Sequence, residues 1–410
     1  MKKIALTIST GRPNVNKVVK AFIENAILYG YNPKDFSIYL SIDTEYQNTK
    51  VEDFQIDEET SKKLNKIEYI TKEIREKMAD QIIFFTGIDV KIVESLFRGR
   101  GYSKQRNSAL LFALKDKNDF AICIDDDESP FVPIKKENGS VKWENLDFFT
   151  PHIKELSSGT DITRGPYLGY KSPIPSDFEK DIPEEIRKKL GEALQWGNDV
   201  ITKDSFLNLM NKIKYLTDEE LKNSARPFIV EQGIHGKNIF AGNMGINLKS
   251  LRLGKIPLFF TPPEARGEDT IFALQLKKVL VKEVNSFIFH DPFNMYPEIF
   301  EGKFPKILRN IPVTADSKKR FANALIGWLK YAPILISMTS LHKKEKIQRI
   351  EKMLETINEP AQQLAEILDC SELKSCHNIL KKYYEQMDSH QGHLIDIQKE
   401  WKTKILPLAI

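Results

Sequence analysis

Cysteine is scarce in this chain, with three among 410 residues. Cys123, Cys370 and Cys376 are too few for a disulfide framework, and the last two, although close to His377, lack the second ligand pair of a structural zinc site. Disulfides are typical of secreted proteins, so their scarcity argues against a disulfide-stapled secreted domain. We therefore expect a reducing compartment and a cytoplasmic protein.

Long apolar runs are also absent. The most apolar stretch, residues 331–341, is well short of the roughly 20 residues that a membrane-spanning helix needs. The opening MKKIALTIST has an apolar run about as long as one strand, and no small-residue cleavage site follows it. We expect no secretion signal and no transmembrane segment. Membrane contact would be peripheral, at the inner face, for example through the terminal WKTKILPLAI.

The chain lacks an excess of one charge as well. Its 61 Lys and Arg residues against 57 Asp and Glu residues leave a net charge of +4, spread along the sequence. A general nucleic-acid-binding role is therefore not expected, and any bound anion would occupy a local site. With 41% hydrophobic and 29% charged residues, the composition is that of an ordinary folded protein, and the length suits more than one domain.

Short apolar runs alternate with helix-length periodic segments in the first 125 residues. Helices are predicted at 14–31 and from Ser103 onward, and strands are predicted at 3–9, 35–43, 66–72, 81–87 and 120–125. Such alternation indicates right-handed crossovers between parallel strands. We therefore predict an α/β fold with a Rossmann-like, mainly parallel mixed sheet and flanking helices.

The rest of the chain has two characters. Residues 129–143 suggest a hairpin or a loop, and residues 165–185 a surface or lid segment. Strands at 226–232, 237–248, 256–263 and 284–293 and a helix at 268–280 are expected to complete the sheet. Beyond about residue 313 the pattern is helical. We predict a domain over 1–312, with a nucleotide-binding half 1–130 and an acceptor half 131–312, and an all-α C-terminal module over 313–410. Packing on the first domain is the default role of this module, and self-association into a homo-oligomer is left open.

One short stretch has a pattern that folding alone does not explain. AICIDDDESP, residues 121–130, runs from an apolar strand straight into acidic residues whose mutual repulsion does not help folding. In an open parallel sheet, ligands bind beyond the carboxyl ends of the strands. Asp125 and Asp127 are two residues apart, so both can point to one side and bind one divalent cation. The alternative is a solvated turn or cap, but the preceding strand and the KQRN helix favour a metal site.

At this point the sequence resembles a known family, the nucleotide-diphospho-sugar glycosyltransferases with the type A fold, and its family 2-like group in particular, over roughly residues 1–295. ALTISTGRP, with Thr10 and Arg12, matches the loop after the first strand. LSIDTE, with Asp43, matches the end of the second strand, where such enzymes contact the nucleotide base. GRGYSKQRN, with Arg106 and Asn107, matches the glycine loop and helix that precede the Asp-x-Asp strand.

The resemblance continues downstream. AGNMGI, with Asn243, matches an acceptor-side loop, and RGEDTIFALQL, with Glu268 and Asp269, matches a Glu-Asp pair at a helix start. FIFHDP, with His290, resembles the metal-ligand histidine of several branches of this fold. The sequence departs from the family in its first loop, STGRP instead of a Pro-Thr-Tyr-Asn type, and in the length of segment 130–235, so the resemblance does not identify the acceptor.

The resemblance implies a role for each residue. Mn²⁺ or Mg²⁺ would be bound by Asp125, Asp127 and His290, because a cation can neutralise the diphosphate as it leaves. Asp269 would be the base that deprotonates the acceptor, and Glu268 would orient it. The nucleoside diphosphate sugar would be bound by Thr10, Arg12, Asp43, Lys104, Arg106, Asn107, Asp125, Asp126 and Asn243.

The predicted function is therefore a metal-dependent glycosyltransferase of the hexosyltransferase type. It would move a sugar to a hydroxyl of a glycan, a lipid-linked acceptor or a small molecule, with inversion if Asp269 is the base. A retaining enzyme of the same fold and a non-catalytic sugar-nucleotide scaffold remain alternatives. A nucleotidyltransferase is a further alternative, but it would need a glycine-rich phosphate loop where STGRPNVNK has one glycine. Asp269 as a simple helix cap and His290 as a core histidine are the structural alternatives.

Overall fold

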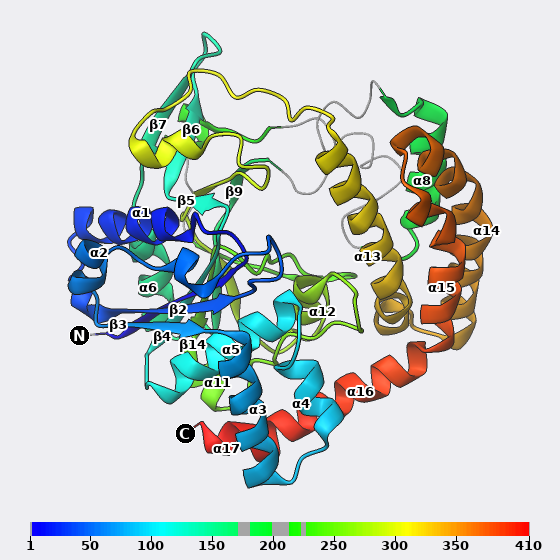
Figure 1. Ribbon diagram of the computed structural model, residues 1–410, viewed down its shortest axis with the longest axis horizontal. Coiled ribbons are helices and arrows are strands. Elements are labelled where there is room, and N and C mark those ends of the chain that lie inside the picture. The colour runs from blue at the N-terminus through cyan, green and yellow to red at the C-terminus, as the bar shows by residue number, and fades with distance from the viewer. Residues whose placement is uncertain (1, 171–180, 199–212, 223–226, 410) are drawn as a thin grey trace.

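The computed structural model describes residues 2–170, 181–198, 213–222 and 227–409. Within them, the largest sheet has eight strands in the order β11-β15-β8-β14-β4-β1-β2-β3 (Figure 1). Strands β1 to β4 are mutually parallel, β14 runs antiparallel to both β4 and β8, and β15 is again parallel to β8. The bounds are β1 Ile4–Thr10, β2 Phe36–Ile42, β3 Lys66–Ile70, β4 Phe120–Asp125, β8 Ile162–Arg164, β11 Phe228–Ile229, β14 Met244–Asn247 and β15 Val281–Glu283. The predicted mainly parallel, mixed sheet with flanking helices is confirmed.

Both faces of this sheet are covered. All residues of β1 and β2 are buried, as expected for strands with helices on each side. Ile4, Leu6 and Ile8 of β1 belong to the apolar cluster that includes α1 (Val15–Leu28). The alternate residue Ala5 belongs to the opposite cluster, which includes α5 (Tyr102–Lys115). The period of two along the strand thus divides the core into two layers.

One predicted strand is a helix. Residues 81–87 were expected to be extended, but they form the end of α3 (Lys72–Thr86). Thr71 caps the start of this helix, accepting a hydrogen bond from the Ile74 amide, and Gly87 ends it in the left-handed conformation with φ 58°. These are standard start and stop signals. They outweigh the apolar run at the helix end, where Phe84 and Phe85 remain exposed.

The second half of the chain departs more from expectation. The predicted hairpin is confirmed as β6 (Phe131–Lys135) and β7 (Val141–Asn145), which pair antiparallel. Residues 256–263 form no strand, although residues 256–260 are buried, and the expected helix 268–280 is only α12 (Glu268–Leu274). A small sheet joins β5 (Glu128–Ser129), β16 (Ile288–His290) and β9 (Tyr167–Gly169). Part of the predicted lid segment, 171–180, lies outside the described residues.

The other short elements connect these layers. They are α2 Glu58–Lys63, α4 Val90–Leu96, α6 Phe149–Ser157, α8 Glu184–Leu194, α10 Asp218–Lys222, α11 Leu248–Arg252, β10 Leu216–Thr217, β12 Gln232–Gly233 and β13 Gly236–Lys237. Short 3-10 turns cover Pro33–Asp35, Val51–Phe54, Pro297–Glu301 and Ser371–Ser375.

The C-terminal region is helical, as predicted. It contains α13 Ala315–Thr339, α14 Lys343–Leu368, α15 Cys376–Glu385 and α16 Met387–Glu400, then a π-helical turn Trp401–Ile405 and α17 Leu406–Leu408. Helices α13, α14 and α15 share an apolar cluster with α8 (Figure 1). The last turns instead join the core beside α5, through Trp401 and Ile405. The division into domains at residue 312 stays a prediction.

Helix α13 has the length and composition of a membrane span. It has 25 residues, and its most apolar window has a mean hydropathy of 1.3. However, 72% of that window is buried inside the protein, as in the core helix of a globular protein. It is the one such helix in the part of the chain that the structure describes.

Candidate active site

The site lies where the order of strands reverses. The chain leaves β1 through α1 to reach β2 on one side, whereas β4 pairs with β1 on the other side. Ligands of open α/β sheets bind at such a switch point, beyond the carboxyl ends of the strands. Thr10 ends β1 and Asp125 ends β4, with Ser9 directly opposite Asp125 in the register. The predicted position of the acidic stretch is therefore reproduced.

Asp126 fastens the acidic turn to the end of β1. Its Oδ2 accepts hydrogen bonds from the Thr10 hydroxyl at 2.9 Å and the Gly11 amide at 3.1 Å, and its Oδ1 accepts from Arg12 Nη1 at 2.8 Å. Burial raises the pKa of Asp126, and repulsion from Asp127 acts in the same direction. The attraction of Arg12 opposes this rise but does not cancel it. Asp126 is thus surrounded by protein donors, so its task here is to shape the loop.

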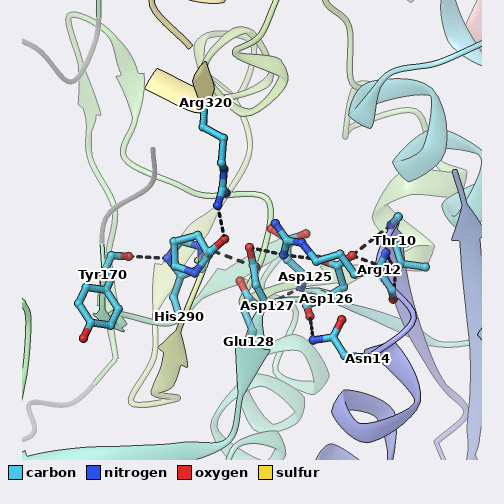
Figure 2. Close-up of polar contacts among 12 residues, drawn as sticks. Thr10, Arg12, Asn14, Asp125, Asp126, Asp127, Glu128, Tyr170, His290 and Arg320 are labelled. Carbon is cyan, nitrogen blue, oxygen red and sulfur yellow. Dashed lines mark hydrogen bonds and ion pairs between the residues drawn. The ribbon is translucent and has the colours of Figure 1, made fainter. Parts of the chain in front are cut away.

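Asp127 faces the opposite way, toward His290 (Figure 2). Its Oδ2 accepts from Arg12 Nη1 at 2.8 Å, and its Oδ1 lies 3.6 Å from His290 Nε2. Burial raises its pKa, but Arg12 and His290 outweigh burial and hold the pKa of Asp127 below its usual value. His290 Nδ1 lies 2.6 Å from the carbonyl oxygen of Tyr170. Because a carbonyl can only accept, Nδ1 carries the proton and Nε2 is directed to Asp127.

Arg106 connects two acidic residues that are distant in sequence. Its Nη2 donates to Asp125 Oδ1 at 2.8 Å, and its Nε lies 3.7 Å from Glu268 Oε1. Its Nη1 donates to the Ala241 carbonyl at 3.2 Å. Although burial opposes it, the two carboxylates raise the pKa of Arg106. The end of β4 and the start of α12 therefore meet at one buried cation, as the sequence motifs require.

Glu128 completes the acidic group, although it was not among the predicted ligands. It is fully buried, and its Oε2 accepts from the Asp125 amide at 2.9 Å, while Oε1 has no hydrogen-bond partner in the described part of the chain. Burial and the neighbouring Asp125 raise the pKa of Glu128 well above its usual value. A Cβ on Gly242 would lie 2.2 Å from Glu128 Oε1 and 2.3 Å from the Tyr167 hydroxyl. Only glycine fits there without displacing them.

These residues fit a divalent cation. Oxygens of Asp125, Asp127 and Glu128 all lie within 4.8 Å of one another. Mg²⁺ and similar hard cations bind oxygens at about 2.0–2.6 Å, so one ion can contact more than one of these carboxylates. The unpartnered oxygen of Glu128 and the Nε2 of His290 are further donors of the right kind. A histidine whose other nitrogen donates to a backbone carbonyl is oriented as metal-binding histidines usually are.

Asp43 extends the site along the sheet edge. Its amide donates to the Thr10 carbonyl at 2.8 Å, and its carboxylate accepts from the Glu45 amide at 3.1 Å and Arg100 Nε at 3.4 Å. Buried Arg75 lies behind it and donates to the Ile42 carbonyl at 3.0 Å. Asp43 is thus next to the β1 loop that holds Asp126, and all three strand ends meet at one edge.

Three of the predicted binding residues have other partners. Asn107 is fully buried, donates to the carbonyls of Leu96 and Phe259, and accepts from the Phe259 amide. Asn243 is also fully buried, with a left-handed φ of 43°; it donates to the carbonyls of Pro166 and Ser286, and its Oδ1 lies 3.0 Å from His152 Nε2. Lys104 Nζ lies beside Gly99 rather than at the carboxylates. The two asparagines therefore brace loops behind the site.

The predicted catalytic pair begins α12. Gly267 precedes the helix in the left-handed conformation, with φ 83°, and Glu268 and Asp269 form its first turn. Asp269 Oδ1 accepts from the Thr270 amide at 2.9 Å. Carboxylates are favoured at a helix N-terminus, so both the capping and the catalytic interpretations of Asp269 stay compatible with this geometry. Its position as acceptor base stays a prediction.

Four residues around the site were not predicted. Glu128 lies in the acidic run itself, where the structure also buries Asp126, Ser129 and Pro130. Tyr167 lies in the predicted lid-like segment and Gly242 in the AGNMGI loop, but neither residue was given a site role. Arg320 of α13 reaches the site from the helical region (Figure 2), and no local signal distinguishes it from the lysines beside it.

Comparisons with known proteins add little. No family model and no curated protein matches this chain. Among solved structures, S. aureus TarS 1-349 is similar at 11% identity over 95% of this chain and 92% of that chain, with a TM-score of 0.38. Its complex with UDP-GlcNAc gives the same values. Its complex with UDP has 12% identity, 95% and 91% coverage and a TM-score of 0.37. A likeness this distant assigns no activity, so the function has to be argued from the site.

Proposed function

We propose that this chain is a glycosyltransferase that moves a sugar from a nucleoside diphosphate sugar to an acceptor hydroxyl, with Mn²⁺ or Mg²⁺ as cofactor. One observation carries the proposal. Asp125, Asp127 and Glu128 gather at the switch point of the sheet, and Arg106 ties Asp125 to Glu268 at the start of α12. Acidic residues for a cation and acidic residues for proton transfer are thus on opposite sides of one arginine.

The donor would lie along the strand ends. Asp43 would contact the nucleoside, and the β1 loop, in which Thr10 and Arg12 donate to Asp126, would approach the diphosphate. Asp125, Asp127 and His290 would hold the ion, and Glu128 adds an oxygen to this set. The bound ion would neutralise the charge that develops on the departing diphosphate.

The acceptor would be activated from α12. Asp269 would take the proton of the acceptor hydroxyl, and Glu268, oriented by Arg106, would position that hydroxyl. A base on the face opposite the leaving group gives direct displacement with inversion at the anomeric carbon. The acceptor class, a glycan, a lipid-linked molecule or a small molecule, and a cytoplasmic location are further parts of the proposal.

The test is nucleoside diphosphate release. The full chain is incubated with a panel of nucleotide sugars and Mn²⁺ or Mg²⁺, with and without EDTA. We expect metal-dependent release from one donor, with slow hydrolysis of that donor even when no acceptor is present. Asp127→Ala and Asp269→Ala should both lose activity, and only Asp127→Ala should also lose Mn²⁺ binding.

A matched control is Asp388→Ala in α16, whose carboxylate is 87% exposed. It should be as active as the parent chain. Release of pyrophosphate instead of nucleoside diphosphate would indicate a nucleotidyltransferase. Donor binding without turnover in the parent chain would contradict the enzyme and leave a sensor. Retention of the anomeric configuration in the product, seen by NMR, would reject Asp269 as the base.

A further inference from the structure

Arg320 brings the helical region into the site. It lies in the second turn of α13, whose start is capped by the Thr314 side chain accepting from the Ser317 amide. Figure 2 shows its side chain directed down from α13 toward His290 and Asp127. The sequence motifs of the first domain give no hint of this contribution.

The guanidinium of Arg320 is held in place by backbone and ring. Nη1 donates to the Pro292 carbonyl at 2.8 Å, and the guanidinium carbon lies 4.3 Å from the centre of the Phe293 ring. Both partners follow directly after His290 and Asp291. A cation fixed over an aromatic face loses little further freedom when it binds an anion.

Its charge is also less neutralised than the charges of Arg12 and Arg106. Arg12 has two carboxylates at 2.8 Å, and Arg106 has one at 2.8 Å. Arg320 makes no ion pair within 4.0 Å in the described part of the chain. Its guanidinium nevertheless lies on the His290 side of the acidic group (Figure 2).

We propose that Arg320 binds the diphosphate of the nucleotide-sugar donor, opposite Arg12. This inference rests on the proposed function. A guanidinium has a planar fork of donors that matches a phosphate. Because Arg320 is anchored through one nitrogen only, its other donors remain for an anion at the metal site. The helical region then supplies a substrate-binding residue and is more than a packing module.

The alternative is that Arg320 only fastens α13 to the turn 291–293. A fastening role and a binding role differ in what they change. Loss of a purely structural contact would lower the thermal stability of the protein and would weaken the binding of every nucleotide equally. Loss of a phosphate contact would selectively weaken the binding of a nucleoside diphosphate. Arg320→Lys would then restore part of that affinity, because the positive charge is kept.

The experiment compares diphosphate with monophosphate. Calorimetric titrations use the full chain with Mg²⁺ and the nucleoside diphosphate that binds best from a panel of bases, then the monophosphate of that base. We expect Arg320→Ala to weaken diphosphate binding by about 10- to 100-fold, the size of one charge-assisted hydrogen bond, and to leave monophosphate binding nearly unchanged. Lys319→Ala, an exposed neighbour on the same helix, is the control and should bind both as the parent does.

The outcomes are separable. If the parent binds no nucleoside diphosphate, the proposed function fails and this inference fails with it. If the parent binds it and Arg320→Ala binds it equally well, or loses both nucleotides in parallel with a lower melting temperature, only the role of Arg320 is rejected. Partial recovery in Arg320→Lys, at the parent's melting temperature, supports it.

Discussion

The edge of the sheet and the helical region follow opposite rules. At the edge, Asp125, Asp127 and Glu128 are crowded together, and a buried oxygen of Glu128 lacks a hydrogen-bond partner in the described part of the chain. In α13, α14 and α15 the buried residues are almost all apolar, and most of them pack in one cluster with α8, whereas Tyr331, Ile334 and Leu335 of α13 join the core beside α5. Crowded like charges reduce stability unless a ligand compensates. The difference suggests that the helices stabilise an arrangement that the sheet edge alone would not favour.

The strongest test of this contrast removes one carboxylate. Asp127→Asn keeps the shape of the side chain and removes its charge. We expect donor turnover to fall by about 10²- to 10³-fold, as when one preorganised electrostatic contact is lost at a reacting centre. Affinity for Mn²⁺ should fall in the same variant, as measured by titration calorimetry. Full activity with unchanged metal affinity would show that the crowded edge has no metal-binding purpose.

A pH titration tests the buried hydrogen bonds of His152, which lie behind the carboxylates at the sheet edge. His152 is fully buried, 2.8 Å from the Thr163 hydroxyl and 3.0 Å from Asn243, and burial lowers its pKa from 6.5 to about 4. The unfolded chain therefore binds a proton first, so His152 leaves stability intact above pH 6.5 and reduces it as the pH falls toward 4. The loss should reach about 3 kcal/mol.

The measurement is the free energy of unfolding in urea between pH 7 and pH 4. His152→Gln should be less stable at pH 7 but should lose less on acidification. His342→Gln, at an exposed position next to α14, is the control and should follow the parent curve. Parallel curves for the parent and His152→Gln would place the acid sensitivity elsewhere, for example in α16.

Alanine substitutions of two glycines, one at the sheet edge and one in the helical region, allow a direct comparison. The substitution at the sheet edge should have the larger effect on stability and activity. In Gly242→Ala, the new methyl group would press on Glu128 and Tyr167. Overpacking of this kind costs about 1–3 kcal/mol, and here it would also displace the acidic group. We expect lower thermal stability and at least a tenfold loss of donor turnover. An unchanged enzyme would mean that Glu128 has room to move and contributes little.

Gly392→Ala in α16 is the matched substitution in the helical region. A Cβ there meets nothing within 4 Å, and the residue is exposed inside a helix. Alanine is a better helix former than glycine by about 1 kcal/mol, so the variant should be slightly more stable. Donor turnover should stay at the parent level. A loss of activity would imply that α16 has to deform during the reaction.

The sequence predicts the charged residues at the sheet edge better than the buried residues that hold the surrounding loops in place. Asp125, Arg106 and Glu268 could be assigned to the site because each stands in a motif, and the structure brings the end of β4, helix α5 and the start of α12 together through Arg106. Asn107 and Asn243 stand in motifs too, but a motif does not tell whether an amide faces a ligand or the backbone of a distant segment. That choice is made by tertiary packing, which local patterns do not record.

The errors in secondary structure have the same origin. In residues 81–87 the apolar run suggested a strand, although Thr71 and Gly87 already marked the ends of a helix. In residues 256–263 the apolar part, 256–260, is buried, but the segment pairs with no strand in the described part of the chain. An apolar run in the sequence predicts that a segment is buried, but it does not predict which segment forms its backbone hydrogen bonds. Arg320 illustrates the limit, since its contribution depends on how a helix more than 180 residues downstream of Asp127 folds back.

The place of Trp401 joins the helical region to the core of the sheet. This residue is fully buried in the apolar cluster that contains Ala109 and Leu110 of α5 and Met244 of β14. Segments that are far apart in the sequence therefore share one core on this side of the sheet. Domains usually have separate cores and meet through smaller interfaces. The last turns of the helical region and the sheet instead form one packed unit, so a change at Trp401 should destabilise the sheet as well as the helices.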